Sequence, residues 1–236
     1  MPFMQRFRKK RELINFYKKF IGKDDLCFDI GANAGERTDA FTRLGAKVIA
    51  IEPQSKCMDL LNQKYRNNHL VQVLQYAAGA EEKEVELMLC DQYDECSTLS
   101  VDFMSTYANL SKLQWSQAEK VQMVTLDSLC LQYGEPHFCK IDVEGYESEV
   151  LKGLTRPVKY ISIEFNRPLL ADTIKSLELI NAIGRYKCNF IQYEMMHLVL
   201  EKWISAGDFK DQLEQLIGPD ILTGEIILEH TGEGYL

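Results

Sequence analysis

The sequence predicts an α/β fold in which helices cover both faces of a mostly parallel sheet. From residue 26 onward, short apolar runs alternate with amphipathic stretches, and this alternation is typical of βαβ units. Glycines such as Gly31 and Gly45 fall where these elements end, at points that favour positive backbone φ angles. We expect one main domain over residues 25–236, preceded by a basic N-terminal helix within residues 1–24.

Each element of the main domain follows from its local pattern. An apolar run gives the first strand, Gly45 ends the first helix, and Ser55 is expected to cap the second helix. Strands are expected at 26–30, 47–51, 70–76, 85–89, 121–126, 137–143, 160–165, 189–192 and 225–229. Helices are expected at 38–44, 55–66, 146–154 and 173–185, with a short one beginning at Asp127.

The stretch from 91 to 120 interrupts this alternation. It is polar and irregular, with one short helix expected at about 103–113, and long insertions in compact domains are often lids or binding loops. Its aromatic residues Phe103, Tyr107 and Trp115 could stack on a bound ring or form the insertion's own small core. Both interpretations stay open.

Basic residues crowd the N-terminal segment. Leu13, Phe16, Tyr17, Phe20 and Ile21 recur at helical spacing, so this segment is expected to be an amphipathic helix with its basic residues on the outer face. Such a helix could pack over the domain edge with that face in solvent, or contact an anionic membrane surface or partner. The basic residues are Arg6, Arg8, Lys9, Lys10, Arg11, Lys18 and Lys19.

Charge and cysteine content narrow the class of protein. Lys and Arg number 27 against 35 Asp and Glu, a formal net charge of −8, which disfavours a general nucleic-acid binder. The seven cysteines form no C-x-x-C pair, so neither a disulfide framework nor a zinc site is indicated, and a cytoplasmic location is expected. No apolar run approaches the roughly 20 residues that a transmembrane helix needs.

The strongest local signal is a strand that ends in a glycine-bearing turn at 28–35. Gly31 and Gly35 let the backbone pass close to a ligand, and Asp29 can accept a hydrogen bond from a ligand ammonium. Glu52 ends the second strand, where a carboxylate can bind both hydroxyls of a ribose. The turn is G-x-x-x-G rather than the pyrophosphate-binding G-x-G-x-x-G. Glycines alone would fit any βα turn, whereas turn and acid together indicate a nucleoside with a cationic group.

Three segments, 29–35, 51–53 and 140–145, together resemble the FkbM-type methyltransferases. The resemblance extends over ordered motifs from about residue 25 to residue 159. It implies a Rossmann-like class I methyltransferase fold, with a seven-stranded, mostly parallel sheet whose last strand is antiparallel. It also implies S-adenosylmethionine as cofactor and methyl transfer, usually to a hydroxyl of a sugar or natural product.

The resemblance also implies which residues bind the cofactor. Gly31 and Asn33 would line the methionine part of the cofactor, Glu52 would bind its ribose, and Ala77 and Ala78 would lie beside the adenine. The full set expected to bind the cofactor is Asp29, Gly31, Asn33, Gly35, Thr38, Glu52, Pro53, Ala77 and Ala78.

Four polar residues follow two neighbouring strands of the predicted sheet. Asp142 and Glu144 end one strand, and Glu164 and Asn166 end the next, at the sheet edge where ligands of such folds collect. Because methyl transfer needs an aligned acceptor and removal of its proton, we predict Asp142, Glu144 and Glu164 to be catalytic. Glu144 could instead only cap the next helix. Asp142, Glu164 and Asn166 would be the ligands if the site held Mg²⁺, a hypothesis kept beside the metal-free one.

Two other classes of protein stay open beside an O-methyltransferase that acts on a small hydroxylated acceptor. An NAD-type oxidoreductase would share the fold, but the third glycine of its fingerprint is missing. A catalytically silent protein that acts through partners would be expected to lack Asp29, Glu52 or Asp142, which are all present.

Overall fold

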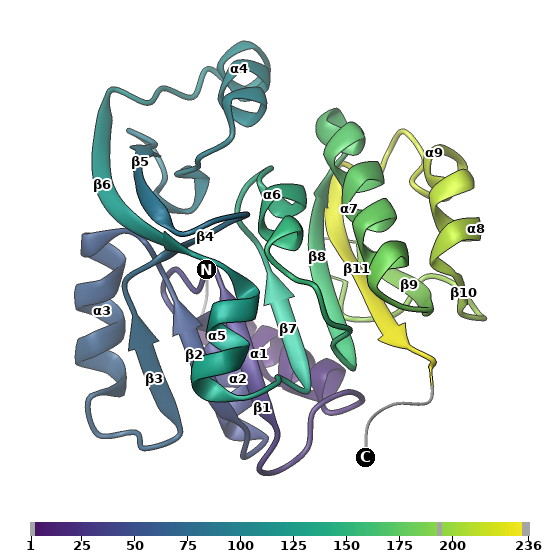
Figure 1. Cartoon of the computed structure of the whole chain (residues 1–236), viewed down its shortest axis with the longest axis horizontal. Helices are drawn as coiled ribbons and strands as arrows, with labels where there is room; N and C mark the ends of the chain where they lie inside the picture. Colours follow the sequence, from purple (N-terminus) through teal and green to yellow (C-terminus); the bar gives the residue numbers. More distant parts are fainter. Residues whose placement is uncertain (1–2, 193–194, 233–236) are drawn as a thin grey trace.

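A mostly parallel sheet runs through the centre of the computed structural model, which describes residues 3–192 and 195–232 (Figure 1). Its strands are β1 (Leu26–Ile30), β2 (Lys47–Ile51), β3 (Val71–Leu74), β7 (Phe138–Ile141), β8 (Tyr160–Asn166), β9 (Tyr186–Gln192), β10 (Ile204–Ser205) and β11 (Thr223–His230). They lie in the order β10-β9-β11-β8-β7-β1-β2-β3. Neighbours from β3 to β8 pair in parallel, whereas β11 runs antiparallel between β8 and β9. This topology confirms the predicted fold class.

One strand goes beyond the seven that were expected. Ile204 and Ser205 pair antiparallel with Cys188 and Lys187 of β9 and form the edge strand β10. A strand of two residues carries no alternation of apolar and polar side chains, which explains why the sequence did not predict it. The short helices α8 (Ala206–Asp211) and α9 (Leu213–Leu216) that follow were not predicted either.

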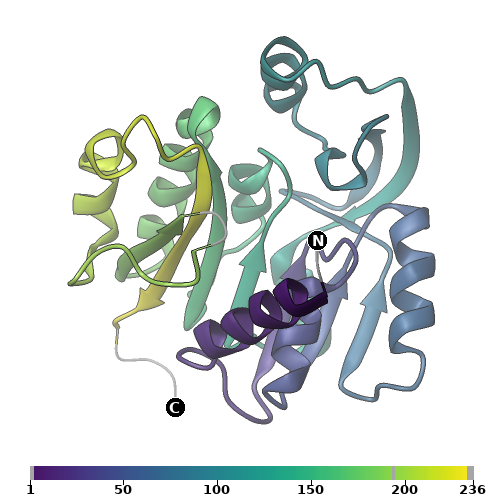
Figure 2. The same cartoon turned by 180° about the vertical axis from the view of Figure 1, so that it is seen from behind.

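Helices cover both faces of the sheet because successive strand residues point to opposite sides. On β1, Cys27 shares a core cluster with residues of α1 (Phe3–Tyr17), α2 (Glu36–Arg43) and α3 (Ser55–Tyr65). Phe28 instead shares a cluster with residues of α5 (Leu126–Tyr133), α6 (Glu147–Lys152) and α7 (Leu170–Ile183). Figure 1 shows α5 and α7 in front of the sheet, and Figure 2 shows α1 in front on the opposite side. The sheet is therefore buried on both faces.

The predicted N-terminal helix forms as α1, which begins next to residues 1 and 2, outside the described part of the chain. The side chains of Leu13, Phe16 and Tyr17 are buried against the sheet and α2. Arg8, Arg11, Lys18 and Lys19 are exposed, whereas Lys10 is half-buried and pairs with Asp39 at 2.8 Å. The apolar face packs as predicted, and contact of the basic face with an anionic surface stays a prediction.

The predicted insertion contributes a second, three-stranded sheet. Its strands are β4 (Ala77–Ala78), β5 (Lys83–Leu89) and β6 (Gln117–Val124), in the order β4-β6-β5. Between β5 and β6 lie a short 3-10 helix, η1 (Asp94–Cys96), and helix α4 (Val101–Leu110), which stands apart from the main sheet in Figure 1. Because β6 begins at Gln117, the end of the predicted irregular stretch 91–120 is extended strand.

Two smaller expectations are also resolved by the structure. Ser55 does not cap α3 but is its first residue, and its hydroxyl and backbone N–H both donate to the Glu119 carboxylate. The cause is strand β6, which brings Glu119 to the start of the helix. Every helix in the described ranges is too short or too polar to cross a membrane.

Candidate active site

A cavity opens where β1, β2 and β7 end, beneath the three-stranded sheet. It contains about 540 Å³ of empty space, part of it open to solvent, a size suited to a small organic ligand. Most of the predicted cofactor and catalytic residues line it. They are Gly31, Asn33, Glu52, Pro53, Ala77, Ala78, Asp142 and Glu144.

Gly31 lets two turns of the site approach each other. Its φ angle is 82°, and a Cβ atom at this position would lie 1.9 Å from the backbone oxygen of Asp142. No other residue fits such a contact without moving the backbone. The sequence therefore needs glycine here to bring the turn after β1 against the turn after β7.

Glu52 is a buried carboxylate at the end of β2. One oxygen accepts the backbone N–H of Asn33 at 2.7 Å, and the other accepts the backbone N–H of Gln54 at 2.9 Å. Burial raises the pKa of Glu52 to about 7, although these hydrogen bonds lower it. Each oxygen keeps a lone pair for a ligand hydroxyl, so Glu52 is fixed and ready to accept hydrogen bonds.

Three residues predicted to bind the cofactor lie behind the turn instead. Asp29 and Thr38 are buried and outside the cavity lining, and the Thr38 hydroxyl donates to the Asp29 carboxylate at 2.5 Å. Gly35 has a φ of 75°, and a Cβ there would meet the Tyr65 hydroxyl at 2.6 Å. The physical reason is the strand alternation, which turns Asp29 toward the face that carries α1 and α2. These residues shape the turn, and their direct contact with the cofactor stays a prediction.

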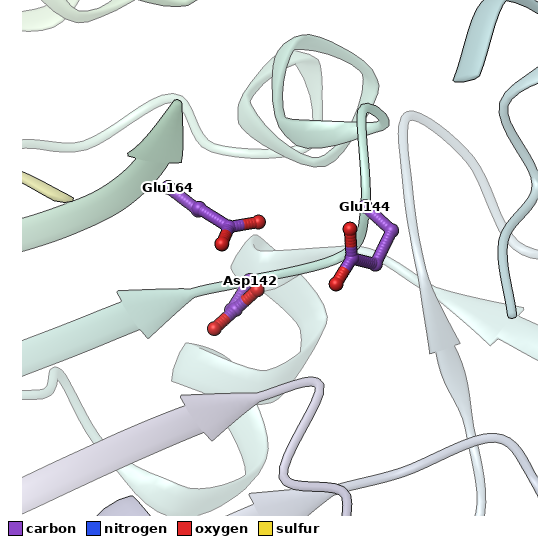
Figure 3. A group of neighbouring side chains, drawn as sticks. All are labelled: Asp142, Glu144 and Glu164. Atoms are coloured by element: carbon purple, nitrogen blue, oxygen red, sulfur yellow. The ribbon is translucent and has the colours of Figure 1, made fainter. Parts of the chain in front are cut away.

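The three predicted catalytic carboxylates converge (Figure 3). Single oxygens of Asp142, Glu144 and Glu164 all lie within 4.8 Å of one another. Burial, together with the nearby Asp142 carboxylate, raises the pKa of both Glu144 and Glu164 well above the ordinary value. Glu144 also has a φ of 54°, an uncommon conformation outside glycine that is often found at functional sites.

A buried charge network, which we call the paired network, supports Asp142 from inside the protein. Lys140 has no exposed side-chain surface, and its Nζ lies 2.8 Å from Asp142 Oδ2 and 3.7 Å from Glu225 Oε1. Glu225 in turn accepts from Arg37 Nη2 at 2.8 Å, and from the hydroxyls of Ser162 at 2.9 Å and Tyr17 at 3.1 Å. Burial disfavours the ionised Glu225, yet the Lys140 and Arg37 cations lower its pKa to about 2. The paired network consists of Arg37, Lys140, Asp142 and Glu225.

The geometry changes the set of possible metal ligands. Asp142, Glu144 and Glu164 have the spacing that a hard cation requires. Asn166, which the sequence grouped with Asp142 and Glu164, is otherwise engaged, since its side-chain oxygen accepts from the Tyr107 hydroxyl at 3.0 Å and its amide donates to Glu164 at 3.2 Å. Glu144 therefore joins Asp142 and Glu164 as a candidate ligand, and the predicted role of Asn166 stays a prediction.

Sequence reasoning missed the paired network and the insertion's share of the site. A lysine inside an otherwise apolar strand should have indicated a buried charge that needs partners, but the strand alone does not say which ones. From the insertion, Glu95 and Thr98 line the cavity, and the Thr98 hydroxyl donates to the Glu144 backbone oxygen at 2.8 Å. No local pattern in this polar stretch distinguished them from its other residues.

Comparison with known proteins identifies the family and the fold of this chain. Residues 29–210 match the family profile described as "Methyltransferase FkbM domain". The chain is 24% identical over 159 residues to "Hexuronic acid methyltransferase AglP" of Haloferax volcanii, a match that covers 66% of this chain and 60% of that protein. The chain therefore spans less than two thirds of that relative's length. The solved structure of precorrin-6y C5,15-methyltransferase from Geobacter metallireducens is 9% identical, with a TM-score of 0.50 over 94% of this chain and 87% of that one, a likeness that shows the fold.

Proposed function

The chain belongs to the FkbM methyltransferase family, and from this premise we propose that it transfers a methyl group from S-adenosylmethionine to a hydroxyl of a small molecule such as a sugar. The observation that carries this proposal is the arrangement of the cavity. A fixed carboxylate, Glu52, and the small apolar residues Ala77 and Ala78 line one part of it, and Asp142 and Glu144 line another. One ligand can thus be held while a second is deprotonated.

The residues present fit the cofactor in chemical character. Glu52 accepts hydrogen bonds, as the ribose hydroxyls require, and Ala77 and Ala78 leave room for a flat apolar ring. The side-chain oxygens of Asp142 can accept hydrogen bonds from the ammonium of the methionine part. When bound, S-adenosylmethionine supplies a methyl group on a positively charged sulfur, with a neutral thioether as leaving group.

The carboxylates then have two separate tasks. Asp142 is held by the Lys140 ammonium, which orients it to accept a hydrogen bond from the acceptor hydroxyl. Glu144 lines the cavity and has a raised pKa, which makes its ionised form the stronger base. We assign Glu144 as the group that takes the hydroxyl proton as the oxygen–carbon bond forms. Glu164, at the end of the neighbouring strand β8, lies beside both carboxylates.

The acceptor's proton is proposed to move to a carboxylate without the help of Mg²⁺. The reason is that the buried Lys140 ammonium already neutralises Asp142 at 2.8 Å, so a divalent ion would meet a positive charge close to its site. Exhaustive chelation should leave turnover unchanged. Loss of turnover on chelation, restored by Mg²⁺, would contradict this assignment.

Three observations bear on the acceptor and on the location of the protein. The name of the Haloferax relative suggests a sugar acid, but at 24% identity it supports only a small hydroxylated acceptor, not a particular one. The net charge of −8 favours such a molecule over a nucleic acid. The seven cysteines are unpaired in the structure, which supports the proposed reducing, cytoplasmic location.

The proposal is tested by calorimetric titration of the protein with S-adenosylhomocysteine and with NAD. We expect S-adenosylhomocysteine to bind and NAD not to bind. Glu52→Ala should lower the affinity for S-adenosylhomocysteine by about 1.5–3 kcal/mol, since it removes a charged hydrogen-bond acceptor. Glu82→Ala, which changes an exposed glutamate of the β4–β5 turn, is the matched control and should bind as the wild type does.

Each other outcome of this titration points to a different class of protein. Binding of NAD would favour an oxidoreductase. No binding of either ligand by the folded wild type would leave a silent protein that uses the fold for interaction. Equal affinity in Glu52→Ala and Glu82→Ala would place the ribose elsewhere.

A further inference from the structure

The cavity is lined by acidic but not by basic side chains, as far as the structure describes the chain. Its charged lining residues, which we call the cavity carboxylates, are Glu52, Glu95, Asp142 and Glu144. No Lys, Arg or His side chain lines it within the described part of the chain. The Glu164 carboxylate lies beside Asp142 and Glu144, and one oxygen of each of these three residues lies within 4.8 Å of the others. A ligand that enters this space therefore meets acidic, neutral polar and apolar side chains but no basic one from the described residues.

The nearest cations are already engaged. Lys140 is fully buried and sits between Asp142 and Glu225, behind the cavity wall. The Arg37 side chain donates to Glu225 at 2.8 Å and to Glu36 at 3.3 Å. Neither residue lines the cavity. A carboxylate or phosphate on the acceptor would thus find no guanidinium or ammonium to pair with.

The acidic character extends to the side formed by the insertion. Glu95 lies in η1, and the Thr98 hydroxyl ties this segment to the backbone of Glu144. A second tie joins Tyr107 of α4 to Asn166 at the end of β8. These two hydrogen bonds hold the insertion over the carboxyl ends of β7 and β8, so Glu95 faces the same space as Asp142 and Glu144.

We propose that the acceptor is a hydroxylated small molecule that carries no negative charge, such as a neutral polyol or an amino sugar. This inference rests on the proposed methyl transfer and narrows its substrate class. An anion that entered the cavity would lose its water without gaining a cationic partner and would meet the exposed Glu95 side chain, whereas the hydroxyls of a neutral polyol find hydrogen-bond acceptors there. The chain would then differ in substrate from its relative named for a hexuronic acid, which carries a carboxylate.

The test uses three probes that share one hydroxylated carbon chain and differ in charge: glucamine, sorbitol and gluconate. Their binding to the full-length protein saturated with S-adenosylhomocysteine is measured by saturation-transfer NMR at low and high salt. We expect glucamine and sorbitol to bind at least about tenfold more tightly than gluconate at low salt. The difference between glucamine and gluconate should shrink at high salt, because salt screens charges.

A charge-reversing variant links the preference to the cavity. Glu95→Lys changes an exposed residue of η1, so the fold should be retained, and we expect it to cut the glucamine-to-gluconate ratio several-fold. Glu82→Lys makes the same change outside the cavity and should leave the ratio at the wild-type value. Equal effects of the two variants would contradict the proposal.

The outcomes separate this inference from the proposed function. Failure of S-adenosylhomocysteine to bind would overturn the proposed function itself. With that ligand bound, gluconate binding as tightly as sorbitol, or no binding by any of the three probes, would overturn the inference about charge and leave methyl transfer standing.

Discussion

The paired network and the cavity carboxylates share Asp142 but differ in their balance of acidic and basic side chains. In the paired network, Lys140 and Arg37 balance Asp142 and Glu225 within 3.7 Å. Along the cavity, Glu52, Glu95 and Glu144 face one another with no basic residue between them, as far as the structure describes the chain. Buried ions are tolerated where they are matched, and unmatched carboxylates at a cavity are typical of groups used in chemistry.

The pKa values of the two regions express this difference. The pKa of Glu225 is lowered to about 2, because Lys140 and Arg37 outweigh the effect of burial. The pKa of Glu52 is raised to about 7, because burial outweighs the hydrogen bonds from Gln54 and Asn33. The comparison teaches that burial alone does not decide the ionisation of a carboxylate in this fold. The neighbouring cations decide it.

Among the variants considered, removal of the Lys140 side chain should lower the free energy of unfolding most. Lys140→Met leaves Asp142 and Glu225 close together without their shared cation, so we expect the free energy of unfolding to fall by about 3–5 kcal/mol. Denaturant unfolding monitored by circular dichroism measures it. Lys120→Met removes an exposed lysine whose pair with Glu84 spans 2.9 Å and should cost less than about 1 kcal/mol. Similar losses in the two variants would show that Lys140 is not stabilised by its partners.

The pH dependence of stability should have opposite signs for Glu225 and Glu52. The lowered pKa of Glu225, about 2 against about 4.5 unfolded, gives stability that is present above pH 4.5 and lost as the pH falls toward 2. The raised pKa of Glu52, about 7, gives stability that is lost as the pH rises from 4.5 to 7. Each amounts to about 3 kcal/mol.

Two variants isolate these slopes. Unfolding free energies between pH 3 and pH 8 should show a shallower acid limb in Glu225→Gln and a smaller loss between pH 5 and pH 7 in Glu52→Gln. Parallel pH profiles for the two variants would mean that the two carboxylates do not differ as described.

The hydroxyl of Tyr17 gives the smallest expected effect. Tyr17→Phe removes its hydrogen bond to Glu225, which spans 3.1 Å, while Ser162 and Arg37 still hold that carboxylate. We expect a loss of about 1 kcal/mol in the free energy of unfolding. Tyr93→Phe, at a residue that is 55% exposed, is the matched control and should change little. A change as large as that of Lys140→Met would mean that α1, rather than the cations, holds the paired network together.

The sequence predicted the regular part of this molecule because local patterns determine it. Strands such as β1 and β2 are short apolar runs bounded by glycines or helices, and their burial on both faces gives a strong signal. The convergence of Asp142 and Glu164 was also predictable, since parallel strands end at the same edge of the sheet.

Other features depend on partners that are distant in the chain. Lys140 becomes a buried cation only because β11 places Glu225 beside it, and no pattern around either residue reveals the pairing. Asp29 lies on the face of β1 that carries α2, where Thr38 donates to it, and its contact with the cofactor stays a prediction. Glu95 lines the cavity because the insertion folds back over it. The path of a polar, irregular segment cannot be predicted from its local sequence.

The contact between α1 and β11 through Tyr17 and Glu225 affects which truncated forms of this protein can be stable. The family match begins at Asp29, inside β1, and stops at Lys210, inside α8. A fragment with those limits would lack α1 and the strand that separates β8 from β9. It would retain Lys140 but not Glu225, so it would bury an ammonium with half of its counter-charge removed. We therefore expect a fragment limited to the matched residues to be less stable than a chain that keeps α1 and β11.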